Sequence, residues 1–215
     1  MKKPALAIGA LALSLLFNTA AIPATNLSPE VVVAKATTSL NVDPAASNIN
    51  WSAKKVGGGH NGTVKLAKGT LTLDGNKLTG GNFVMDMTTI ADADQSARLT
   101  NHLKSEDFFG VEKNPNSTFV ITKATPVGKA KAGLTNYNIT GNLTIKGITN
   151  PISFPAVVKL DNNTAEATAK IEVNRLKYDI KFRSGLIGTA ADKIIEDTFT
   201  LDVKIVAGKS TTAKL

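Results

Sequence analysis

The sequence has no cysteine and little that could hold a metal or form a nucleophilic catalytic site. Without cysteine, the 215-residue chain forms no disulfide, thiolate nucleophile or cysteine zinc site. Its two histidines, His60 and His102, have no HxH or HxxxH spacing, so we expect no metal site. His102 and Asp107 are close enough in sequence to pair, but no GxSxG motif accompanies them. We therefore expect no catalytic residues, and a small-substrate hydrolase remains an alternative.

Long hydrophobic runs are also scarce. The run at residues 4–17 is 14 residues long, which is short of the ~20 that cross a bilayer as a helix. It follows a basic start, Met1-Lys2-Lys3, and precedes small residues at 18–21, as in a secretory signal. An uncleaved anchor is the alternative.

The distribution of apolar, small and polar residues divides the chain into four parts. We expect a signal peptide over residues 1–21, with its cleavage site open, and a flexible tether over 22–38. A β-domain over 39–207 and a polar tail over 208–215 follow. A signal peptide predicts a secreted location.

Acidic residues are fewer than basic residues, and the formal net charge is +8. The basic residues are spread along the chain, which favours a solvated surface; peripheral contact with anionic lipid is the alternative. No basic stripe is interleaved with exposed aromatics, so we expect no nucleic-acid partner.

Strict alternation of apolar and polar residues is the main pattern that is present. Residues 137–147 alternate with a period of two, and the alternation resumes over 152–160. This period predicts two strands with one buried face each. Thr149-Asn150-Pro151 interrupts the run and predicts the turn between them.

Similar alternation predicts further strands, including one through 178–182, and Asn61-Gly62 and Asp74-Gly75 predict tight turns. Residues 91–110 differ, and predict a short helical insertion near residues 95–110, with Ser105 capping a second turn. About eight strands in one antiparallel series predict an all-β fold. An up-and-down barrel is favoured, because closure hides strand edges, and a sandwich is the alternative.

Several stretches resemble the YceI family. They read HLKSEDFF at 102–109, VEKNP at 111–115, STF at 117–119, GNLTIKGITNP at 141–151 and IEDTFTL at 195–201. The resemblance covers roughly residues 39–207, in order along the chain. Gly110 departs from it, because family members often carry an acidic residue there.

The resemblance implies a lipocalin-like barrel that is periplasmic or secreted in bacteria and binds a polyisoprenoid or similar long amphipathic lipid in its lumen, without established catalysis. No cofactor is expected beyond a bound isoprenoid lipid or quinone, and family members often form homodimers. A secreted structural or stress protein without a ligand is the alternative function. The residues expected at the lumen and mouth are Trp51, Phe83, Met85, His102, Leu103, Phe108, Phe109, Phe119, Ile139, Leu143, Phe154, Ala167 and Phe182.

Overall fold

The computed structural model describes residues 37–129, 133–161 and 163–209. The predicted signal peptide, most of the predicted tether and residues 210–215 of the predicted tail lie outside this part of the chain. Within the described residues, no helix is long and apolar enough to cross a membrane.

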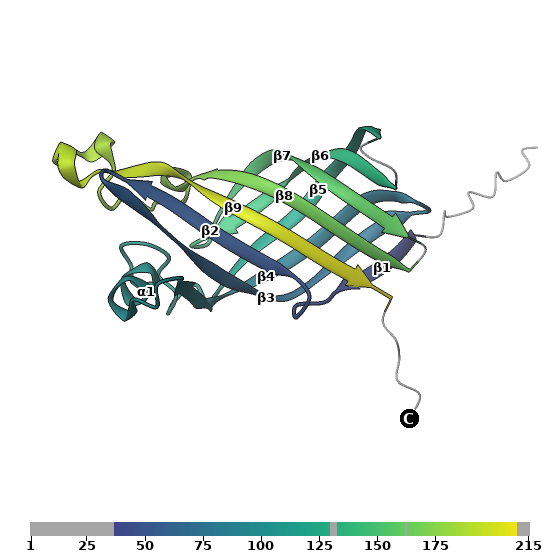
Figure 1. The fold of residues 1–215 in the computed structure, drawn as a ribbon, viewed down its shortest axis with the longest axis horizontal. Coiled ribbons are helices and arrows are strands. Elements are labelled where there is room, and N and C mark those ends of the chain that lie inside the picture. Colours follow the sequence, from purple (N-terminus) through teal and green to yellow (C-terminus); the bar gives the residue numbers. More distant parts are fainter. Residues whose placement is uncertain (1–36, 130–132, 162, 210–215) are drawn as a thin grey trace, which may run out of the picture. The chain divides into compact units, whose positions relative to one another are not determined.

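The described chain forms a closed antiparallel β-barrel (Figure 1). Its elements in chain order are β1 (Thr37–Val42), β2 (Asn48–Lys55), β3 (Gly58–Asp74), β4 (Lys77–Asp92), α1 (Ala97–Lys104), β5 (Asn116–Lys129), β6 (Leu134–Ile145), β7 (Ile148–Asp161), β8 (Thr164–Asn174), the 3₁₀ turns η1 (Arg175–Tyr178), η2 (Gly185–Ile187) and η3 (Ala191–Lys193), and β9 (Ile195–Gly208).

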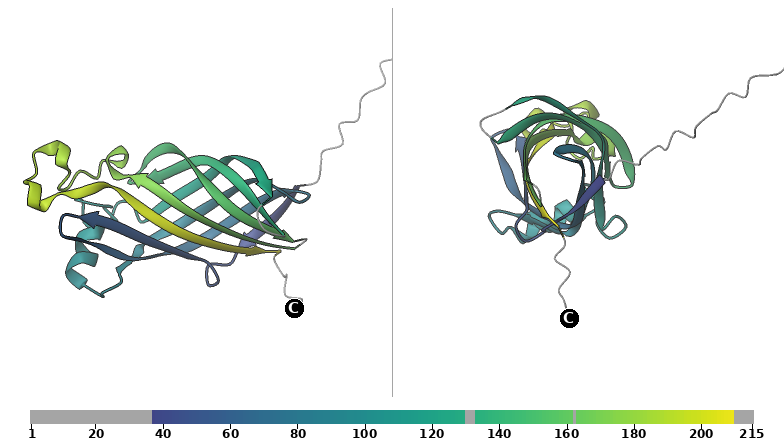
Figure 2. Two further views of the ribbon diagram at one scale, coloured as in Figure 1. Left: turned by 45° about the horizontal axis from the view of Figure 1, so that its top comes forward. Right: turned by 90° about the vertical axis from the view of Figure 1, so that its right-hand side faces the viewer.

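Nine strands fill eight positions around the barrel. β2 and β1 both pair with β3 on one side and β9 on the other, so they lie end to end in a single position. Pairing of β3 with β4 closes the ring, which Figure 2 shows when viewed along the barrel. The predicted eight-stranded barrel is confirmed, and the sandwich is excluded. Closure pairs each strand with a neighbour on both sides over at least part of its length.

The barrel core is built from the alternation that the sequence shows. Ile139, Leu143 and Ile145 on β6 are buried, and Phe154 and Val158 on β7 face the same interior. Tyr137 joins them, and its hydroxyl accepts a hydrogen bond from the Leu78 amide at 3.2 Å.

The turn of this central hairpin lies earlier than predicted. Lys146 and Gly147 form the two-residue loop, with φ of 51° and 72°. Positive φ at both residues is what a two-residue hairpin loop of this kind needs. The 149–151 stretch belongs to β7 instead. Pro151 is tolerated there because β7 pairs with β8 only from Ala156 onward.

Three further predictions are wrong. Asn61-Gly62, predicted as a tight turn, lies inside β3, and the turn before β3 is at Val56-Gly57. The other predicted turn, at Asp74-Gly75, is confirmed. Residues 178–182 form no strand, because η1 and its following loop close one end of the barrel there. Ser105 ends α1 by donating its hydroxyl to the His102 carbonyl, whereas Ser96 caps the helix start.

α1 lies in the connection between β4 and β5, within the predicted 95–110 region, and turns continue to residue 113. It therefore lies at the same barrel end as the loop over 175–194 (Figures 1 and 2). We call this the α1 end. The β3–β4 and β7–β8 turns lie at the opposite end.

Candidate functional site: an apolar barrel lumen

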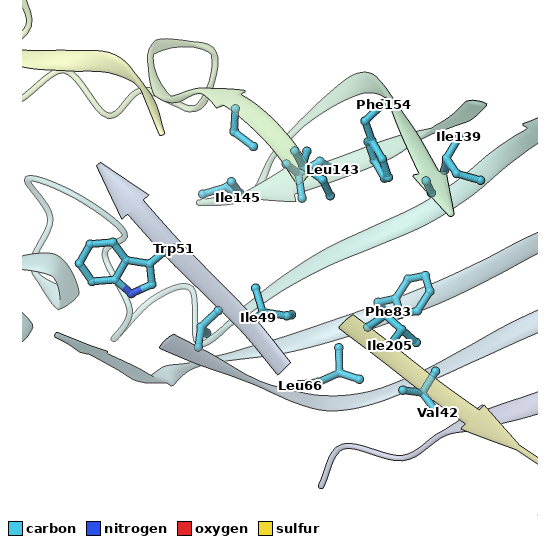
Figure 3. Close-up of a cluster of buried hydrophobic side chains, with 14 of the residues drawn as sticks. Val42, Ile49, Trp51, Leu66, Phe83, Ile139, Leu143, Ile145, Phe154 and Ile205 are labelled. Atoms are coloured by element: carbon cyan, nitrogen blue, oxygen red, sulfur yellow. The ribbon is translucent and has the colours of Figure 1, made fainter. Parts of the chain in front are cut away.

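The barrel encloses a cavity of about 190 Å³. All eight strand positions contribute lining side chains, together with Leu103 of α1. The lining is apolar apart from Ser117, Arg175, Glu196 and the indole nitrogen of Trp51. Figure 3 shows Ile139, Leu143 and Phe154 facing Ile49, Leu66 and Phe83 from the opposite wall.

Small residues leave this space open. Ala167 and Ala169 on β8 pair with Ile205 and Val203 on β9, and all four line the cavity. Val203 and the two alanines are packed against the core but remain part-exposed. The inward alanines thus open space that larger side chains would fill.

The cavity volume limits what the lumen holds without rearrangement. A core cavity of about 150 Å³ accepts one benzene, so the lumen at rest accepts a group slightly larger than that. A longer chain has to displace lining side chains as it enters. Met85 and Met87 are in the lining, and methionine adapts its shape readily.

Of the thirteen side chains predicted for the lumen and mouth, the structure brings eleven into the cavity lining. His102 and Phe182 lie outside it. Sequence reasoning missed many other lining residues, although their alternation with polar neighbours marks most of them as inward-facing. Examples are Val64, Leu71, Ile121, Ile171 and Leu201.

His102 and Phe182 belong to an aromatic cluster at the α1 end. The His102 ring lies edge-on to Phe108 at 4.9 Å and to Phe182 at 4.6 Å, and the two phenyl rings are 5.4 Å apart. Phe108 also lines the cavity and is buried, whereas its neighbour Phe109 is part-exposed. The cluster therefore joins the α1 connection to the 175–194 loop beside the lumen.

The His102 imidazole also pairs with a carboxylate. His102 Nε2 lies 3.0 Å from Asp107 Oδ2, and both side chains are substantially exposed. Ser105 bonds to the His102 carbonyl and not to its ring. The ring also contacts the two phenylalanines, so the pair is an anchor for the loop after α1.

Arg175 closes the lumen at the same end. Its side chain is 4% exposed, and its five N–H groups donate to the carbonyls of Glu196, Ile180, Phe182 and Ile195 and to Asp197 Oδ1. A guanidinium has five donors, so none remains for a ligand. Burial lowers the pKa of Arg175, and Asp197 partly offsets this. Arg175 thus ties the end of β8 to the loop and to β9.

Three buried polar atoms at this end have no hydrogen-bond partner within the described part of the chain: Trp51 Nε1, Asp92 Oδ1 and the Tyr178 hydroxyl. Gly62 pairs with Trp51 on one side and with Asp92 on the other, so the three residues form one row across β2, β3 and β4. Buried donors and acceptors are normally paired. Of this row only Trp51 lines the cavity, so its indole N–H is an unpaired donor at the α1 end of an otherwise apolar lumen.

Among the described residues, no group of three or more His, Cys, Asp or Glu side chains could hold a metal ion.

Known structures share this barrel. The crystal structure of Burkholderia cenocepacia BcnA superposes with a TM-score of 0.63 and 22% identity over 77% of this chain and 99% of that chain. A polyisoprenoid binding domain from Saccharophagus degradans superposes with a TM-score of 0.60 and 15% identity over 80% and 98%. At these identities the comparison establishes a shared fold.

Sequence comparison identifies the family. A UPF0312 protein of Staphylococcus epidermidis is 31% identical over 69% of this chain and 86% of its own length. A UPF0312 protein of Pseudomonas putida is 30% identical over 50% of this chain, and that match spans about half of the relative, 54%. The YceI-like domain matches residues 40–207. The chain therefore belongs to the YceI-like domain family, as the sequence motifs predicted.

Proposed function

We propose that this protein binds one long-chain amphipathic lipid, such as a polyisoprenoid or an isoprenoid quinone, with its apolar chain in the barrel lumen. The observation that carries the proposal is the cavity inside the barrel, with its almost wholly apolar lining. Burying an apolar chain there supplies about 25 cal/mol per Å² of surface removed from water. The polyisoprenoid binding domain with the same fold supports this choice of ligand.

The biological setting is part of the same proposal. The N-terminal pattern of residues 1–21 favours export to the bacterial periplasm, where the barrel transports, stores or protects its lipid. Binding is favoured over catalysis because the His102–Asp107 pair lies outside the cavity lining. It is also favoured over a ligand-free structural role because the interior is hollow.

Native mass spectrometry of the purified protein, followed by lipid extraction, tests the proposal. We expect a co-purified lipid, or stoichiometric binding of added polyprenols and short-chain quinones. Trp51 is the single tryptophan and lines the cavity, so its fluorescence reports occupancy of the lumen. Absence of bound lipid and of binding to every added chain would contradict the proposal.

A variant that fills the lumen gives a second test. Ala167→Phe places a ring in the cavity and is expected to abolish lipid binding while the barrel stays folded. Thr168→Phe, on the outward face of the same strand, is the matched control and should bind as the wild type does. Equal lipid binding by both variants would show that the ligand lies elsewhere.

A further inference from the structure

Large apolar side chains are exposed together at the α1 end of the barrel. Leu186 and Ile187 in η2 are 80% and 57% exposed, and Val56 in the β2–β3 turn is 55% exposed. The Val56 amide donates to the Ile194 carbonyl at 3.0 Å, and Ile194 packs beside Gly185, which precedes Leu186. The two turns lie side by side in Figures 1 and 2. We call Val56, Leu186 and Ile187 the tip patch.

The loop holds these side chains outward through its own hydrogen bonds. Ser184 is fully buried and its hydroxyl accepts from the Leu186 amide at 3.2 Å. The Thr189 hydroxyl donates to the Ser184 carbonyl at 2.7 Å, and the Ile195 amide donates to the Arg183 carbonyl at 2.9 Å. The apolar residues of η2 therefore stand on an anchored turn.

Four basic residues lie close to the tip patch along the chain. Lys54, Lys55, Arg183 and Lys193 are exposed, and none forms an ion pair within the described part of the chain. Arg183 lies over the Phe182 ring at 5.2 Å.

The acids nearby do not cancel this charge. Asp192 and Glu196 are exposed, which leaves the four cations with a net charge of +2. Asp179 pairs with Lys181 at 2.6 Å, so these two offset each other. Exposed apolar side chains beside unpaired cations complement the surface of an anionic lipid bilayer, which has negatively charged headgroups above an apolar interior.

We propose that the tip patch docks this protein on an anionic lipid bilayer, with Leu186 and Ile187 entering the interface and the surrounding cations meeting lipid headgroups. This inference goes beyond the lumen function and does not depend on the lumen being occupied. The docked end is the one that carries α1 and the His102–Phe108–Phe182 cluster. A lipid could thus pass between the membrane and the lumen at that end.

Vesicle co-sedimentation of the purified full-length mature protein tests the proposal. We expect binding to mixed phosphatidylcholine–phosphatidylglycerol vesicles, weaker binding to pure phosphatidylcholine, and loss of binding at high salt. The double variant L186S/I187S should bind these vesicles at least about tenfold more weakly than the wild type. The double variant K54E/K55E should show a similar loss with a reduced salt dependence.

Val127→Ser is the matched control. Val127 is 62% exposed on β5 at the opposite end of the barrel, so its replacement removes exposed apolar surface away from the tip patch and should leave vesicle binding unchanged. Ala167→Phe separates the two proposals, because it should block the lumen and still bind vesicles.

Two results would overturn the membrane proposal. One is that the wild-type protein binds neither vesicle type. The other is that L186S/I187S binds vesicles as the wild type does. If that variant also shifts from dimer to monomer in sedimentation, the patch would be assigned to contact between copies of the chain.

Discussion

The Trp51 indole lies directly on Gly62, its partner across β2 and β3. A Cβ built on Gly62 would come within 2.7 Å of the indole ring and 1.9 Å of the Ala91 carbonyl oxygen. Gly141 on β6 is paired with Ile121, and a Cβ built on it would come within 2.5 Å of the neighbouring Phe119 ring. In both places a glycine makes room for a large aromatic ring that lines the lumen.

We expect Gly62→Ala to destabilise the barrel by about 2–3 kcal/mol, because the new methyl group overlaps backbone as well as the indole. Urea unfolding measures the change. Gly80→Ala in β4 is the control, because its Cβ would meet Thr72 at an ordinary 3.6 Å. That variant should be neutral or more stable by about 0.5–1 kcal/mol. Equal effects at both glycines would contradict the packing argument.

Arg175→Lys should cost at least about 3 kcal/mol in the free energy of unfolding, since one ammonium cannot replace five donors and leaves buried carbonyls unpaired. Chemical denaturation measures it, with the exposed neighbour Lys177→Gln as the control, expected within about 0.5 kcal/mol. A small loss for Arg175→Lys would show that the loop over 175–194 is held by other contacts.

The two tyrosines should respond differently to loss of the hydroxyl at neutral pH. Tyr137→Phe leaves the buried Leu78 amide without its partner and should cost about 1–3 kcal/mol. Tyr178 is as deeply buried, but its hydroxyl has no partner among the described residues, so Tyr178→Phe should be neutral or stabilising. Thermal unfolding of both variants distinguishes them, and the reverse order would contradict the hydrogen-bond assignment.

Alkaline pH should destabilise the protein partly through Tyr178. Burial raises the pKa of its phenol, so above about pH 10 the unfolded chain loses this proton before the folded chain does. The free energy of unfolding then falls as pH rises toward the folded-state pKa. Tyr178→Phe should show a shallower fall than the wild type over this range, and parallel profiles would rule out a role for Tyr178.

Trp51→Phe tests where the head group of a lumen ligand lies. The unpaired indole N–H should favour farnesol over farnesene, which has a similar apolar chain but no oxygen. Removing the N–H should reduce that preference by about threefold to tenfold, as calorimetric titration can measure. Tyr178→Phe also removes an unpaired polar atom, but outside the cavity lining, and should keep the preference. An unchanged preference in Trp51→Phe would place the oxygen elsewhere.

The strands were predictable where one face is wet and the other buried. Residues 137–145 show this because each inward residue is apolar and each outward one is polar. Turns were harder: Asn61-Gly62 has the composition of a hairpin loop, yet Gly62 lies inside β3 because Trp51 occupies the space above it. The stretch 178–182 alternates as a strand would. However, the Ile180 and Phe182 carbonyls accept hydrogen bonds from Arg175, and the stretch forms a loop.

By itself the sequence determined the class of structure and the chemistry that is missing: two-faced strands, no thiols and few histidines, with motifs of one family. These are local properties, because period, composition and motif order do not depend on what a residue meets across the fold. Three features were decided only by the tertiary structure. β1 and β2 share one strand position in the barrel, all five N–H groups of Arg175 are hydrogen-bonded, and the alanines of β8 line a cavity. Each of these depends on contacts between residues far apart in the chain, which register and barrel closure bring together.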